Sequence, residues 1–296
     1  VQTCALPIFR RSARFDTPVV LWLLVLVFAN QWSLYTTQIV VSEGLFSVFA
    51  IAAIYFLAGA GTGTVQDRHV LMASLFASAG YLTRTAGVAL IGGGLIYLVL
   101  EKRFRQALLF TMCSAPFVLA WIFWQHQTAT NLNPVEAYYT SQNYSDWNVI
   151  LSSDFTQSNR IAIVVSNAIR VWIYPIEVIF PLTSTVHLPP ILVLVLPVPF
   201  WICIVAGVRR APRQLASAAW FAVLTIGMCL LWTWPPDRLM LPLLPLFVMF
   251  GYFGYPRGIP HAAALVLFPV SLYVVLLAAQ NTAAHGVGSF APRPGV

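Results

Sequence analysis

Three ionisable side chains interrupt long apolar runs in this 296-residue chain, at Glu43, Arg84 and Arg238. A carboxylate inside an apolar helix costs about 2.5–3.5 kcal/mol to insert into a bilayer, so Glu43 is expected to face a polar cavity or a cationic partner. Arg84 and Arg238 are the available partners. Because a guanidinium can also hold a phosphate through two parallel hydrogen bonds, these residues predict an anion-binding site with an acid beside it.

Arg238 follows two prolines and Asp237 at the start of an apolar run. The prolines end the preceding helix but fit the first turn of the next, so a helix is expected to restart near Asp237. Its free N–H groups beside the Arg238 guanidinium would suit phosphate. One alternative is that Arg238 extends to lipid headgroups while Asp237 caps the helix. Another is that Glu43 and Arg84 pair only to lock two helices together.

The composition requires a lipid environment for this chain. Apolar residues make up 59% and charged residues only 8%, which predicts a polytopic membrane protein surrounded by membrane lipids. The net charge of +7 would suit nucleic acid, but the basic residues fall in short clusters between apolar runs, as topology signals do. Nucleic acid is therefore excluded as a partner.

The apolar runs predict an all-α transmembrane bundle of about nine membrane helices and one interfacial helix. Seven of the membrane helices are expected at residues 18–35, 38–58, 107–125, 188–208, 215–234, 239–255 and 261–279. Residues 69–100 are predicted to form a hairpin of two short helices with Arg84 at the junction, because one span would place the next basic cluster outside. Residues 161–181 contain Arg170, Glu177 and two prolines, which favours a helix lying at the interface.

These elements divide the chain into parts with different expected roles. Taking the basic clusters as cytoplasmic places Glu43, Arg84 and Arg238 together on the extracytoplasmic side. The parts are a cytoplasmic or non-native leader (1–14), N-terminal membrane helices (15–125) with the hairpin (69–100), an extracytoplasmic loop and interfacial helix (126–187), C-terminal membrane helices (188–279) and a tail (280–296).

The polar segment at residues 126–160 is long enough to form part of a site. Four of its side chains are candidates for binding an acceptor or a metal ion, namely His126, Glu136, Tyr138 and Asp146. Their spacing matches no metal template, so the alternative is that each is an ordinary loop residue. Aromatic residues such as Tyr138 also suit the half-apolar interface, where they can stack on sugars.

Three short segments resemble landmarks of the GT-C membrane glycosyltransferases. They are residues 35–46 around Ser42-Glu43-Gly44, residues 79–90 around Thr83-Arg84-Thr85, and residues 237–245, which begin Asp-Arg-Leu-Met-Leu-Pro. The branch that they resemble contains the bacterial relatives of protein O-mannosyltransferases and of the aminoarabinose transferase that acts on lipid A. The resemblance covers roughly residues 15–279.

Membership of that family would imply transfer of a sugar from a polyprenyl-phosphate-linked donor to a lipid, glycan or protein acceptor, with inversion, outside the bacterial inner membrane. By position, Arg238 and Arg84 resemble residues that bind the donor phosphate, and Glu43 resembles the acid at the cavity end of its helix. The family's catalytic aspartate lies in a first external loop that would precede residue 1. We therefore expect the chain to be N-terminally truncated and inactive alone. A divalent metal ion is compatible with this chemistry.

Two other classes of protein share some of these features. A secondary transporter would also place charges within broken helices, but the chain contains no second copy of the Ser-Glu-Gly or Thr-Arg-Thr segment. A non-catalytic membrane scaffold would explain the apolar bulk, although it gives no reason for the charges to gather on one side. The pattern therefore favours the transferase.

Overall fold

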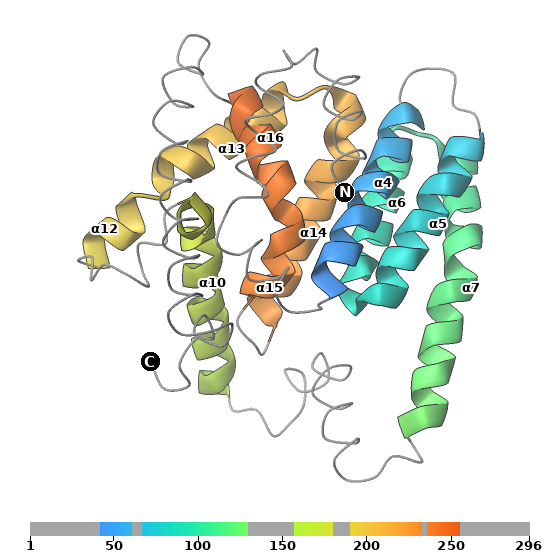
Figure 1. Cartoon of the computed structure of the whole chain (residues 1–296), viewed down its shortest axis with the longest axis horizontal. Helices are drawn as coiled ribbons and strands as arrows, with labels where there is room; N and C mark the ends of the chain where they lie inside the picture. Colours follow the sequence, from blue (N-terminus) through green and yellow to red (C-terminus); the bar gives the residue numbers. More distant parts are fainter. Residues whose placement is uncertain (1–41, 61–66, 130–156, 180–189, 233–235, 255–296) are drawn as a thin grey trace, which may run out of the picture.

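Long runs of apolar residues form helices throughout the part of the chain that the structure describes. The structure is a computed structural model, and it describes residues 42–60, 67–129, 157–179, 190–232 and 236–254 (Figure 1). These ranges contain α-helices and short 3₁₀ helices and no strand, so the predicted all-α class is confirmed for them. The predicted helices at 18–35 and 261–279, the leader and the tail lie outside these ranges.

The N-terminal group contains the predicted helical hairpin. Its elements are α4 (Ser42–Ala60), α5 (Asp67–Thr83), the 3₁₀ turn η1 (Thr85–Gly87), α6 (Val88–Leu100) and α7 (Phe104–Ala129). Helix α5 packs against α4 on one side and α7 on the other, and it also contacts α6. The chain reverses at Arg84, whose extended backbone (φ −150°, ψ 133°) separates α5 from η1. The prediction of two short helices joined at this residue is confirmed.

The C-terminal group differs from the prediction in one place. Its elements are α10 (Gln157–Ile179), α12 (Pro190–Val195), α13 (Val198–Arg210), η2 (Arg213–Leu215), α14 (Ala216–Leu231), α15 (Asp237–Met240), η3 (Leu241–Leu243) and α16 (Leu244–Gly254). The single helix predicted at 188–208 is wrong, because the chain turns before Pro197 and forms two helices of 6 and 13 residues. Pro197 and Pro199 lack the N–H groups that would continue the first helix.

Two of the described helices are long and apolar enough to cross a membrane. They cover Phe104–Trp124 and Arg213–Leu231, with 21 and 19 residues, where spans were predicted at 107–125 and 215–234. At 1.5 Å per residue the first is about 31 Å long, which matches the hydrocarbon core of a bilayer. The apolar helices at Glu43–Gly59, Thr85–Leu100 and Leu241–Gly254 are shorter. The 23-residue helix α10, predicted to lie at the interface, is not among the spanning candidates.

Close helix crossings join the elements of the C-terminal group to each other and to the hairpin. Helices α13 and α16 contact each other along their lengths, and α14 packs against α6. Gly207 and Gly254 lie at the first crossing, where an added Cβ would sit 1.7 Å from a backbone oxygen of the opposite helix. Small residues permit this approach of two backbones, which is a common way for helices to associate in membranes.

The two ends of the bundle carry different charges. The end of α4, the start of α5 and the connections α6–α7 and α13–α14 lie at the upper end in Figure 1, and the start of α4, the α5–α6 junction and α15 lie at the lower end. The upper end therefore carries the basic clusters at 102–105 and 209–213. One of its arginines, Arg210, donates from Nη1 to the main-chain oxygen of Gly254 (3.0 Å) and so caps α16. The separation of the basic clusters from Glu43 and Arg84 is as predicted.

Candidate binding site at the α4–hairpin junction

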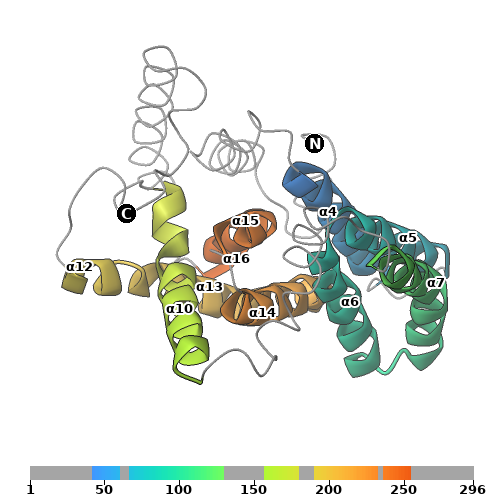
Figure 2. The same cartoon turned by 90° about the horizontal axis from the view of Figure 1, so that it is seen from below.

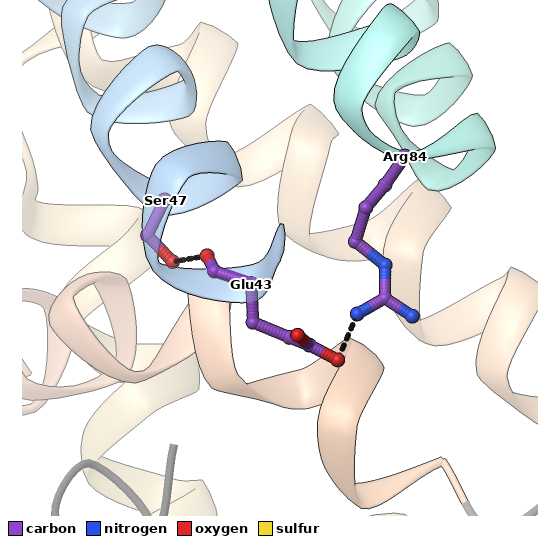
Figure 3. A network of polar contacts seen from close by, with 3 residues as sticks. All are labelled: Glu43, Ser47 and Arg84. Carbon is purple, nitrogen blue, oxygen red and sulfur yellow. Dashed lines mark hydrogen bonds and ion pairs between the residues drawn. The ribbon is translucent and has the colours of Figure 1, made fainter. Parts of the chain in front are cut away.

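Glu43 lies in the first turn of α4, and it is buried there with 2% exposure. The turn that holds it is reinforced locally, because the Ser47 hydroxyl donates to the main-chain oxygen of Glu43 (2.8 Å; Figure 3). A carboxylate in such a position loses its hydration and needs donors from the protein or from a ligand. The position of Glu43 is therefore costly unless it has a partner.

That partner is Arg84, at the reversal between α5 and η1. The Arg84 amide donates to the main-chain oxygen of Gly80 (3.0 Å), and the Gly87 amide donates to the oxygen of Arg84 (2.8 Å), which fixes the tight turn. Gly87 has to be small, because an added Cβ would lie 2.5 Å from the backbone of Tyr81. This geometry directs the Arg84 side chain toward the first turn of α4 (Figure 3).

Arg84 and Glu43 form a largely buried ion pair between Nη1 and Oε1, with side-chain exposures of 22% and 3%. The expectation that Glu43 has a cationic partner is confirmed. The pair uses only part of its hydrogen-bonding capacity within the described residues. The buried Oε2 atom of Glu43 has no hydrogen-bond partner there, and the Arg84 guanidinium forms an ion pair there with Glu43 alone. The site thus offers an acceptor and several N–H donors side by side.

The segment that carries Arg238 reaches the same end of the bundle. A helix begins at Asp237, as predicted, and continues through η3 into α16. Helix α15 contacts α10 and α14, and η3 contacts α4, the helix of Glu43. Figure 2 shows α15 and α16 beside α14. The side chains of Asp237 and Arg238 lie outside the described residues, so the structure places only their backbone.

Asn167 on α10 is a polar contact that the sequence analysis missed. Its side chain is buried (5% exposed), and Nδ2 donates to the main-chain oxygen of Trp232 (2.6 Å). Trp232 is the extended residue that ends α14, shortly before α15 begins. The hydrogen bond therefore connects α10 to the end of α14, the helix that precedes α15 in the chain. Nothing in the sequence of α10 distinguishes Asn167 from Asn159 as the residue with this role.

Replacing Asn167 by alanine is expected to lower the free energy of unfolding by about 1–2 kcal/mol, because the part-buried hydrogen bond from Asn167 to the main-chain oxygen of Trp232 is lost. An ionised aspartate cannot donate and should be no better. Thermal unfolding of the purified chain in detergent would measure the difference, with the exposed neighbour Ser166→Ala as the matched control. Equal stability of the Asn167 and Ser166 variants would show that the hydrogen bond from Asn167 to Trp232 does not stabilise the fold.

The candidates in the predicted external loop are not brought together by the described part of the structure. The prediction that His126 lies in a loop is wrong, because α7 continues to Ala129 and His126 is exposed in its last turn. No glycine or proline follows Gln125 to stop the helix there. Glu136, Tyr138 and Asp146 lie outside the described residues. Within the described ranges, no three His, Cys, Asp or Glu side chains come together in a way that could hold a metal ion.

No known protein family, curated protein or solved structure matches this chain. The resemblance to GT-C glycosyltransferases therefore rests on the three sequence segments alone. The structure brings two of the residues that carry it, Glu43 and Arg84, into direct contact. It also places the third segment against the helix of Glu43 through η3.

Proposed function

We propose that this chain belongs to a membrane glycosyltransferase that transfers a sugar from a polyprenyl-phosphate-linked donor to an extracytoplasmic acceptor, with inversion. One observation carries the proposal. A buried ion pair, with donors and an acceptor that no described residue engages, lies at the end of the bundle opposite the basic clusters, next to the segment of Arg238. A buried polar atom without a hydrogen-bond partner among the described residues calls for an explanation, and a bound ligand would supply one.

The bilayer is part of the proposal. We propose a bundle of about nine membrane helices, two of them short, with α10 at the interface of a bacterial inner membrane. The outward face of α7 supports this, since Leu108, Met112 and Phe123 are between 61% and 65% exposed. Such a face suits lipid chains better than water. The basic end then faces the cytoplasm, and the ion pair faces the extracytoplasmic side.

The proposed sugar transfer requires that the negative charge developing on the donor phosphate, which is a good leaving group, be neutralised. Arg84 retains N–H groups that can hold a phosphate oxygen, and Arg238 provides a second guanidinium on a segment nearby. Positioning donor and acceptor in a site that excludes water contributes the rest. Glu43 is held by Arg84, so a different group has to deprotonate the acceptor. A divalent metal ion would fit this scheme but no step depends on it.

Binding of a lipid phosphate by the full 296-residue chain in lipid nanodiscs tests the proposal. Undecaprenyl phosphate should bind and the neutral alcohol undecaprenol should not. Arg238→Ala is expected to weaken phosphate-lipid binding at least tenfold, the loss of about one charge-assisted hydrogen bond. Arg209→Ala, at the basic end, is the matched control and should bind as the unmodified chain does. Unchanged affinity in Arg238→Ala would remove the phosphate role.

The rival classes predict other outcomes of the same experiment. A secondary transporter would also use a buried ion pair, but it gives no reason for a preference for undecaprenyl phosphate over undecaprenol. A scaffold would bind neither lipid selectively. Equal binding of the two lipids would therefore contradict the transferase.

A further inference from the structure

The Glu43–Arg84 pair is an acceptor and a set of donors held in one fixed geometry. Arg84 contacts Oε1 through Nη1, while Oε2 is buried without a hydrogen-bond partner among the described residues. A buried acceptor left unsatisfied is costly, and such groups in folded proteins call for an explanation. In Figure 3 the second terminal nitrogen of Arg84 points away from Glu43. A ligand that contacts both residues would therefore present an acceptor to Arg84 and a donor to Glu43.

The charge of the pair limits which chemical groups can donate a hydrogen bond to Oε2. The guanidinium already neutralises the carboxylate, so an ammonium group would bring an uncompensated positive charge to a buried place. A neutral hydroxyl supplies the missing hydrogen bond without that charge. The complementary ligand is thus a phosphate ester that carries a hydroxyl close to the phosphate.

We propose that Oε2 of Glu43 accepts a hydrogen bond from the hydroxyl on the ring carbon next to the anomeric carbon of the donor sugar, while Arg84 holds the phosphate. This rests on the proposed function. The hydroxyl on that neighbouring carbon is the sugar group nearest to an anomeric phosphate, so it is the one that a contact beside Arg84 can reach. Glu43 is then a determinant of sugar specificity and does not act as the base.

The experiment compares five lipids on the full chain in nanodiscs: undecaprenol, undecaprenyl phosphate, its glucosyl and mannosyl esters, and the 2-deoxyglucosyl ester. The 2-deoxyglucosyl ester lacks the hydroxyl by which glucose and mannose differ, so it is the common deoxy analogue of both. At least one of the two hydroxylated esters should bind at least about tenfold more tightly than the deoxy ester. This is the difference in affinity that one hydrogen bond to a charged acceptor is expected to produce. Glu43→Gln should reduce this preference below about threefold. Ser47→Ala, which removes only a bond to the main chain of the same turn, should keep it.

The outcomes separate this inference from the function on which it rests. If undecaprenyl phosphate binds and all three esters bind equally well, the hydroxyl contact is overturned and the phosphate site stands. If none of the phosphate lipids binds better than undecaprenol, the proposed function is overturned. Should Glu43→Gln fail to fold, the comparison of the hydroxylated and deoxy esters on the unmodified chain still decides.

Discussion

Replacing Gly207 by alanine is expected to destabilise the chain by about 3 kcal/mol, the upper part of the range for an overpacked core. The added Cβ would lie 1.7 Å from the main-chain oxygen of Phe250, which is a rigid backbone atom of α16. Helices α13 and α16 would have to separate, and the contacts along their shared face would be weakened. The loss should appear as a lower unfolding temperature of the purified protein in detergent, with a smaller monodisperse fraction.

The chain contains a reciprocal variant and a matched control for this experiment. Gly254→Ala should behave like Gly207→Ala, since its Cβ would lie 1.7 Å from the main-chain oxygen of Cys203. Gly227, in the middle of α14, has nothing within 4 Å of an added Cβ. Alanine there should be neutral or should stabilise by up to about 1 kcal/mol, because alanine favours helices. Equal stability of the Gly207 and Gly227 variants would contradict the close crossing.

Features set by local chemistry could be predicted from the sequence. The break at Arg84 follows from a polar Thr-Arg-Thr segment between two apolar runs, combined with the need to keep both neighbouring basic clusters on one side. The helix start at Asp237 follows from the two prolines before it. The placement of Glu43 and Arg84 at one end follows from counting helices. The first two features depend on residues close together in the chain, and the third depends only on the order of apolar runs and basic clusters.

Features set by tertiary contacts could not be predicted in this way. The hydrogen bond of Asn167 and the Gly207–Gly254 crossing join residues far apart in sequence, and neither residue type marks its partner. Proline is ambiguous for a different reason, because it fits the first turn of a helix as well as it ends one. The run at 188–208 therefore looked continuous although it turns before Pro197. Tertiary contacts also decide that Oε2 of Glu43 has no hydrogen-bond partner among the described residues.

Replacing Arg84 by alanine is expected to cost about 3–5 kcal/mol of stability, because it leaves the buried Glu43 carboxylate without its cation. The exposed pair Arg105–Asp67 (2.8 Å) is the matched control. Its arginine side chain is 86% exposed, so Arg105→Ala should cost less than about 1 kcal/mol. Thermal unfolding in detergent measures both variants. A loss of less than about 1 kcal/mol in Arg84→Ala would show that the pair contributes little to the fold.

The double variant Glu43→Gln/Arg84→Ala separates the structural role of the pair from its role in binding. Most of the loss in Arg84→Ala comes from the unpaired charge, so neutralising Glu43 should restore at least half of the lost stability. If the pair only locks α4 to the hairpin, the restored protein should bind undecaprenyl phosphate as the unmodified chain does. If the pair belongs to the donor site, binding stays weak at restored stability, since the guanidinium that holds the phosphate is gone. In the first case the double variant therefore regains both stability and affinity for undecaprenyl phosphate. In the second case it regains stability alone.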